Sequence, residues 1–232
     1  MSSSSSLKSQ VGNRLVFENA ADMIRAAGYE PARAILTQSF IRSEVLMSTS
    51  TSQYNLPVIV TQNQGANQFN TERRLQLTDV FVVSSIQVQA AKPASSTDAA
   101  YGLYNYGNTT IFSTSTCAAA INGVYANGFL SMLIDNNQML PAWDLDQHFR
   151  TPITQQASVI YYSAATPIPV QDSRDGAADG VVACEPNFVL AGNFNIQFSL
   201  NTIAGMSAVE TNSRWIVRLR GILAQNTSKI SS

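Results

Sequence analysis

The sequence predicts an all-β protein, a β-sandwich or barrel, over most of its 232 residues. Three observations carry this prediction: short segments with alternating apolar and polar residues, turn-rich spacers between them, and no strand–helix–strand alternation. The stretch NFNIQFSLN is the cleanest segment, because Ile196, Phe198 and Leu200 alternate with amide and hydroxyl side chains. Successive strand side chains point to opposite faces, so we expect this segment to bury one face and to expose an uncharged polar one.

About ten to twelve strand candidates occur in the body of the chain, among them 54–61, 73–91, 158–164, 181–192 and 214–225. A single jelly roll needs about eight strands and tolerates long loops, whereas a double one needs about sixteen. The count therefore favours a single jelly roll, with a compact double jelly roll as the alternative. In addition, the spacing predicts one short helix over 117–128 and a hairpin that reverses at Asn136 and Asn137.

Alternation within the longest strand candidate predicts which side chains share a face. It places Val80 and Ile86 on one face and Phe81 and Gln87 on the other. The last strand candidate alternates in the same way, with Trp215 on the opposite face from Arg218 and Arg220.

The N-terminal segment has a different periodicity. Residues 1–14 are rich in serine, and we predict a flexible tail. Residues 15–53 are predicted to form a helical arm of two short helices and a polar linker. The first helix is expected to end at Gly28, and the second to begin near Pro31. The β body would then occupy residues 54–232.

Composition limits the classes of function. Charged residues make up only 12% of the chain, and the net charge of −1 provides no electrostatic footprint for nucleic acid. A surface of neutral amides and hydroxyls suits contacts between subunits, from which charged residues are depleted. The isolated Cys117 and Cys184 are expected to be buried thiols, with a single disulfide as the alternative. No apolar run approaches a membrane span, and no secretory signal is recognisable, so we expect a cytoplasmic protein.

Few residues could perform chemistry. Asp144, Asp146 and His148 alternate and are candidate metal ligands, although Asp and His in such a segment commonly bond backbone amides instead. The segment 172–180 resembles a calcium loop only loosely, because its spacing departs from the EF-hand pattern. No nucleophile motif or phosphate-binding loop is present. The sequence therefore predicts no enzymatic activity, no cofactor and, these candidates apart, no metal.

Five residues are candidates for an interface. Arg218 and Arg220 lie on the outward face of the last predicted strand and could bind carboxylates of a neighbouring subunit; the alternative is a solvated face. Tyr101, Tyr104 and Tyr106 could anchor a subunit contact, where tyrosine is enriched. Alternatively, they could form the exposed aromatic cluster of a receptor- or carbohydrate-binding module.

Four stretches carry a resemblance to a known family: TERRLQLTDVFVVSSI (71–86), MLPAWDLDQHFRTPITQQ (139–156), EPNFVLAGNFNIQFSL (185–200) and RLRGILAQN (218–226). In this order they resemble the capsid proteins of small tailless bacterial viruses, especially those associated with Bacteroidetes. The resemblance implies a jelly-roll coat subunit that self-assembles into an icosahedral virion shell in the host cytoplasm. It implies as partners copies of the chain in a trimer or higher assembly and other virion proteins. The N-terminal arm would contact an internal membrane, an internal protein or a neighbouring subunit. The alternative is a receptor- or carbohydrate-binding β-sandwich of a phage particle.

Overall fold

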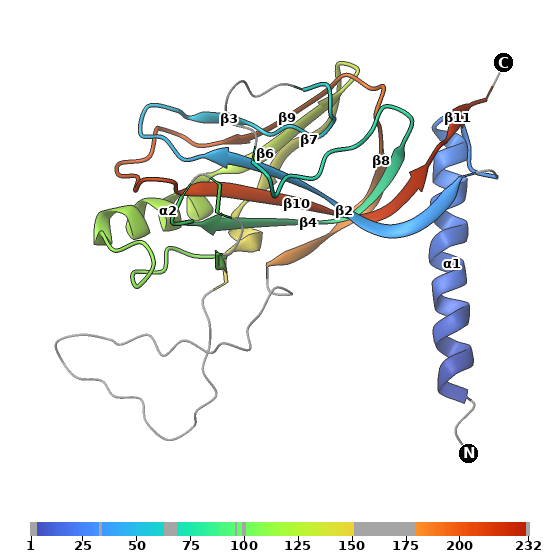
Figure 1. Cartoon of the computed structure of the whole chain (residues 1–232), viewed down its shortest axis with the longest axis horizontal. Helices are drawn as coiled ribbons and strands as arrows, with labels where there is room; N and C mark the ends of the chain where they lie inside the picture. The colour runs from blue at the N-terminus through green and yellow to red at the C-terminus, as the bar shows by residue number, and fades with distance from the viewer. Residues whose placement is uncertain are drawn as a thin grey trace.

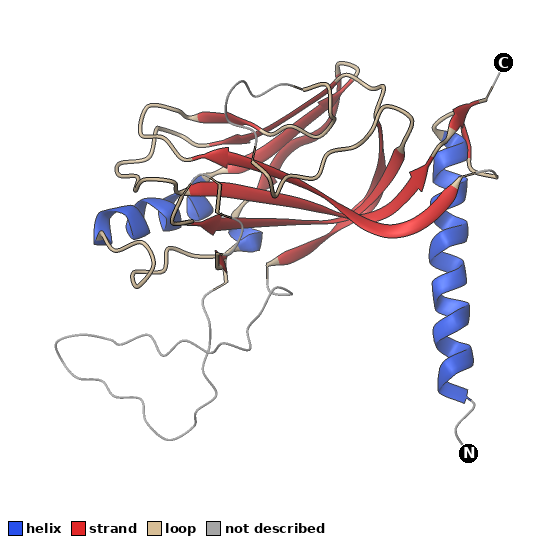
Figure 2. Cartoon of the chain, in the orientation of Figure 1, coloured by secondary structure: helices blue, strands red, loops and turns tan. Residues whose placement is uncertain are grey.

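A computed structural model of the chain describes residues 4–32, 34–62, 69–95, 97–98, 101–150 and 180–230. Strands dominate this part of the chain (Figure 2). Every pairing between its named strands is antiparallel. The prediction of an all-β protein is therefore confirmed. The predicted strand 158–164 and most of the calcium-like segment 172–180 lie outside the described residues.

Two sheets pack face to face (Figure 1). In the first sheet, β2 (Ile35–Leu46), β10 (Arg214–Gln225) and β4 (Val80–Ala91) follow one another; β8 (Val181–Ala191) and β5 (Leu103–Tyr104) pair along the other edge of β4. The second sheet has the order β3 (Gln53–Asn55), β9 (Ile196–Asn201), β6 (Phe129–Ile134) and β7 (Asn137–Asp144). A small ribbon pairs β1 (Tyr29–Glu30) with β11 (Ser228–Lys229). The helices are α1 (Ser4–Ala26), α2 (Ser115–Asn127) and the 3-10 turn η1 (Asp146–His148).

The main core lies between the two sheets and is closed at one end by α2. Trp215 of β10 is fully buried there, edge-on to Tyr125 of α2 at 5.6 Å between ring centroids. Ile196, Phe198 and Leu200 enter the same core from β9, as their alternation predicts. Both cysteines are buried free thiols, which confirms that prediction. The short helix predicted over 117–128 is α2.

The β6–β7 hairpin turns one residue earlier than predicted. Its two central residues are Asp135 and Asn136, with φ of 49° and 65°. A two-residue hairpin turn of this type needs positive φ at both positions, and Asp and Asn tolerate that conformation best after glycine.

The second predicted helix is wrong, because residues 35–46 form strand β2. This strand pairs with β10 along its whole length, from Ile35 opposite Gln225 to Leu46 opposite Arg214. Several β-branched residues favour the extended form, and twelve residues of ladder with β10 outweigh the weak helical stripe. The sandwich therefore begins at β2, and the domain boundary predicted at residue 54 is wrong.

Helix α1 begins at Ser4, so the helical region includes most of the segment predicted as a flexible tail. Its C-terminal half packs on the outer face of the five-stranded sheet, where Ala20 and Ile24 contact a small second core around Val82 and Ile222. α1 stands at the opposite end of the molecule from α2 (Figure 1). Among the described residues, no helix combines the length and apolarity needed to cross a bilayer.

A β-bulge changes the face predictions for β4. Its register against β10 shifts between Ser85, opposite Arg220, and Val83, opposite Gly221, so Ser84 is the extra residue. Before the bulge Phe81 faces the main core, and after it Ile86 does. The predicted alternation places Phe81 and Ile86 on opposite faces and is therefore wrong, because the extra residue of the bulge brings both to the same face.

Candidate functional site

The outer faces of the two sheets differ in charge. Strands β3, β6 and β9 carry no charged residue, and β7 carries one, Asp144 at its end. By contrast, the outer face of the five-stranded sheet carries Arg42 and Glu44 from β2, and Arg214, Arg218 and Arg220 from β10. Interface cores are depleted of charged residues. The uncharged face is therefore the candidate for contacts between copies, and the charged face is the candidate for binding an ionic group.

Hydrogen bonds within the uncharged face satisfy its inner polar groups. Asn201 Nδ2 donates to Ser131 Oγ at 2.9 Å and to Ser199 Oγ at 3.1 Å, and the two serine hydroxyls are 2.9 Å apart. Ser199 is buried beneath these contacts, whereas Asn195 and Gln197 are exposed. The exposed amides are left to bind water or another protein.

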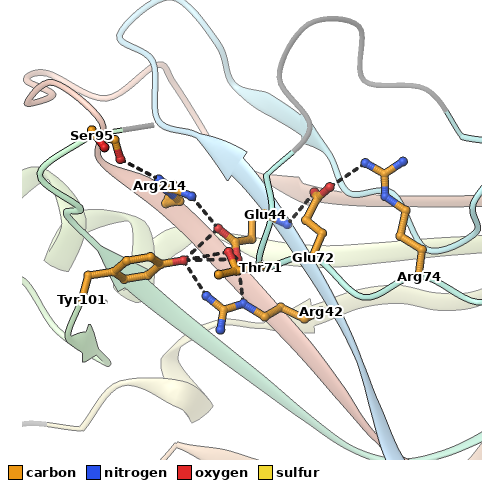
Figure 3. A network of polar contacts seen from close by, with 8 residues as sticks. All are labelled: Arg42, Glu44, Thr71, Glu72, Arg74, Ser95, Tyr101 and Arg214. Carbon is orange, nitrogen blue, oxygen red and sulfur yellow. Dashed lines mark hydrogen bonds and ion pairs between the residues drawn. The ribbon is translucent and has the colours of Figure 1, made fainter. Parts of the chain in front are cut away.

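Glu44 is the centre of a buried ionic network on the charged face (Figure 3). Its carboxylate accepts from Arg42 Nε at 2.7 Å, from Arg214 Nη1 at 2.9 Å, and from the hydroxyls of Thr71 and Tyr101. The side chains of Glu44 and Arg214 are 0% and 1% exposed. Two guanidinium groups and two hydroxyls therefore replace the water that a buried carboxylate loses.

Aromatic rings cover the cations of this network. The guanidinium of Arg214 lies 4.1 Å from the ring centroid of Phe69 and 5.1 Å from that of Tyr101. The Tyr101 hydroxyl accepts from Arg42 Nη2 at 2.6 Å and donates to Glu44. Burial is the main reason that the pKa of Tyr101 is raised. Tyr101 therefore serves the packing of its own subunit.

A second ion pair extends the network. Arg74 Nη2 lies 2.6 Å from Glu72 Oε2, and Glu72 Oε1 accepts the backbone N–H of Glu44 at 3.2 Å. Both side chains of this pair are buried, and burial raises the pKa of Glu72 against the opposing effect of Arg74. These residues connect the 69–79 segment to β2. No motif predicts the network, because the apolar spacing predicts a helix over residues 35–46. The alternation of Arg42 and Glu44 with Ile41 and Ser43 is the sequence signal that points to it.

Apart from Tyr101, the predicted interface residues form two separate pairs, one of tyrosines and one of arginines. Tyr104 and Tyr106 are half-buried and pack edge to face with centroids 6.3 Å apart, so they form no exposed aromatic cluster. Arg218 and Arg220 are half-buried on the charged face, where Arg220 Nη2 donates to Gln87 Oε1 at 2.9 Å. Burial, followed by the charges of the neighbouring arginines, lowers the pKa of Arg218.

His148 is buried at the end of the core with both ring nitrogens occupied. The Trp143 indole N–H donates to Nε2 at 2.8 Å, and Nδ1 lies 2.7 Å from the Gly180 carbonyl oxygen. An indole N–H only donates, so the imidazole is neutral, with its proton on Nδ1. Asp144 accepts from the backbone N–H of Asp146 at 3.0 Å. Within the described ranges, no group of three or more His, Cys, Asp or Glu residues could hold a metal.

We expect His148 to make the fold sensitive to mild acid. Burial lowers the pKa of His148 from 6.5 to about 4. Between these values the imidazole is protonated in the unfolded chain and neutral in the folded chain. The depressed pKa thus contributes stability above pH 6.5 that is lost as pH falls toward 4. Between pH 7.5 and pH 5 the loss is about 2 kcal/mol. Urea unfolding at the two pH values measures it. His148→Gln should be less stable at both, with this pH-dependent loss removed; an unchanged loss would show that another group is responsible.

No protein-family model matches the chain, and neither the curated proteins nor the solved structures compared with it show a significant match.

Proposed function

We propose that this chain is a coat subunit of the icosahedral shell of a small tailless bacterial virus. We further propose that it folds as a single jelly roll whose N-terminal helix α1 is an arm for contacts with other virion components. Its proposed partners are copies of itself, and no catalytic role is assigned to it.

The winding of the strands supports the jelly roll. With the two-residue strands β1, β5 and β11 left aside, the described part of the chain has eight strands, from β2 as first to β10 as eighth. Numbered in that way, one sheet has the order first, eighth, third and sixth, and the other has second, seventh, fourth and fifth. Two Greek keys wound in this manner characterise the jelly rolls of viral capsids, but also those of lectins and cupins. The fold alone therefore does not select the function.

The uncharged face of the four-stranded sheet is the observation that favours a coat protein. A free monomer normally keeps itself soluble with surface charge, and here an entire sheet face lacks it except at Asp144. In a closed shell each subunit is surrounded by copies of itself, so neutral hydrogen-bonding surface can be covered without burying an ion.

The two alternatives have less support from the structure. A carbohydrate-binding module would present exposed aromatic rings, but Tyr101, Tyr104 and Tyr106 are half-buried and contact their own subunit. A metal-dependent enzyme of the cupin type would need free imidazoles, and His148 has both nitrogens bonded.

A charge placed on the uncharged face should block assembly. Gln197 is exposed on β9, and Gln197→Glu changes its charge while nearly preserving its shape. If this face packs against another copy, each contact must bury an unpaired carboxylate, so we expect size-exclusion chromatography and electron microscopy to show loss of the assemblies formed by the unsubstituted chain.

Gln147→Glu is the matched control, because Gln147 is exposed on η1 and lies outside the sheet face. It should leave assembly unchanged, and both variants should unfold at the same urea concentration as the unsubstituted protein. Normal assembly of Gln197→Glu would show that the uncharged face is not the contact, and a chain that remains monomeric without substitution would refute the coat function.

A further inference from the structure

A cavity of about 660 Å³ lies between helix α1 and the outer face of the five-stranded sheet. Val16, Ala20 and Met23 line it from the helix, and Phe40, Arg218 and Arg220 are among the residues that line it from the sheet. Ligand sites for small molecules have volumes of roughly 300–1,000 Å³, so the space suits a ligand and exceeds what a few water molecules fill. The cavity therefore joins an apolar helix face to a basic sheet face.

The basic side of the cavity has an excess of positive charge. None of its described lining residues is Asp or Glu. Arg218 lies directly opposite Arg42 in the β2–β10 ladder, although like charges at such positions repel. Arg218 Nε is buried and has no hydrogen-bond partner among the described residues. A carboxylate or phosphate in the cavity would neutralise the repulsion between the arginines, and guanidinium groups bind both anions with high geometric fit.

The apolar side of the cavity is exposed to an unusual degree. Val16 is 50% exposed and Phe40 is 41% exposed, although both face a cavity that Met23 and Ile222 also line. Burying apolar surface is favourable, and covering these side chains requires an aliphatic group next to the anion. A hydrophilic anion alone would satisfy the arginines and leave this wall in water.

We propose that the cavity binds an amphiphilic anion, a molecule with one carboxylate or phosphate group on an aliphatic chain. The head group binds Arg218 and Arg220, and the chain lies along Val16, Met23 and Phe40. The site belongs to a single subunit, so it does not depend on the proposed coat function. A free amphiphile and a phospholipid of a bilayer share this chemistry.

Isothermal titration calorimetry with decyl phosphate, octyl phosphate and inorganic phosphate tests both halves of the site. We expect decyl phosphate to bind more tightly than octyl phosphate, by up to about fourfold for each added methylene, and inorganic phosphate to bind most weakly. Arg220→Gln should weaken decyl phosphate binding about tenfold or more, because a charge-assisted hydrogen bond is lost. Val16→Asn should weaken decyl phosphate but leave inorganic phosphate unchanged.

Two controls match these variants. Arg25→Gln removes an exposed arginine of α1 that does not line the cavity, and Leu15→Asn changes an exposed apolar residue next to Val16 that does not line it either. Neither should alter binding. Equal binding by Arg220→Gln would place the ligand elsewhere and overturn the proposal. An unchanged affinity of Val16→Asn for decyl phosphate would also overturn it, since a site for anions alone, such as a nucleic-acid backbone, would behave in that way.

Cosedimentation with vesicles separates the two sources of the ligand. Binding to phosphatidylglycerol vesicles but not to phosphatidylcholine vesicles, lost in Arg220→Gln, would identify a bilayer lipid. Decyl phosphate binding without vesicle binding would identify a free amphiphile. Both results support the proposal, whereas vesicle binding that Arg220→Gln leaves intact, without decyl phosphate binding, would refute it.

Discussion

Glu44→Gln should lower the free energy of unfolding by about 3–5 kcal/mol, because it leaves buried arginine charge without its counter-ion. Arg214 is 1% exposed, and its Nη1 lies 2.9 Å from the carboxylate of Glu44. Arg42 loses the same counter-ion, and Arg218 lies directly across the ladder from Arg42. Glutamine keeps an acceptor and nearly the same volume, so the loss reports the charge and not a cavity. Urea denaturation at neutral pH measures it.

Asp22→Asn is the control for this prediction. Asp22 pairs with Arg25 on the surface of α1, with both side chains more than half exposed. An exposed pair of this kind contributes about 0–1 kcal/mol, so the change in stability should be small. The double variant Glu44→Gln with Arg214→Met should recover part of the loss, because the unpaired buried cation is removed. Equal, small effects of Glu44→Gln and Asp22→Asn would show that Glu44 is solvated, against the described burial.

Gly221→Ala should destabilise the protein by about 2–4 kcal/mol through a backbone clash. Gly221 lies at the β10 side of the bulge, where an added Cβ would meet the Val82 carbonyl oxygen at 1.8 Å and the Ser84 backbone nitrogen at 3.2 Å. Both atoms belong to the neighbouring strand, so no side-chain rotation can relieve the overlap. β4 and β10 would have to separate at the centre of the five-stranded sheet. Thermal and urea unfolding measure the loss.

Gly123→Ala is the matched control, because an added Cβ at this position in α2 meets nothing within 4 Å. Glycine in a helix interior is worse than alanine by about 0.5–1 kcal/mol, so this variant should be more stable than the unsubstituted protein. If both glycine variants had the same effect, the close approach at the bulge would not be the cause.

The sequence predicted the elements in which local periodicity and tertiary burial agree. In β9, Ile196, Phe198 and Leu200 occupy every second position and all face the main core. In β10, Trp215 is separated from Arg218 and Arg220 by the same alternation. These segments are uninterrupted strands with one apolar face, for which a period of two is a sufficient signal.

The remaining features depend on contacts that a single segment does not reveal. β2 carries a helix-like stripe and is a strand because β10 offers it a full ladder. The β4 bulge reverses the faces around Ser84, and it lies beside Gly221 of β10, where an added Cβ would meet the Val82 carbonyl oxygen. The Glu44 network joins β2, the 69–79 segment, β10 and Tyr101 across more than 150 positions of sequence. The sequence predicts Tyr101 and Arg218 only as candidates for an interface, whereas the structure shows that Tyr101 contacts Arg42 and Glu44 of its own chain.

A reconstruction by electron microscopy of particles formed by the purified chain tests the coat proposal most directly. We expect closed shells in which the outer face of β9 and β6, with Gln197 and Ser131, is covered by a neighbouring copy. Monomers at every concentration, or shells in which that face points to solvent, would contradict the proposal that uncharged sheet surface holds this protein to copies of itself.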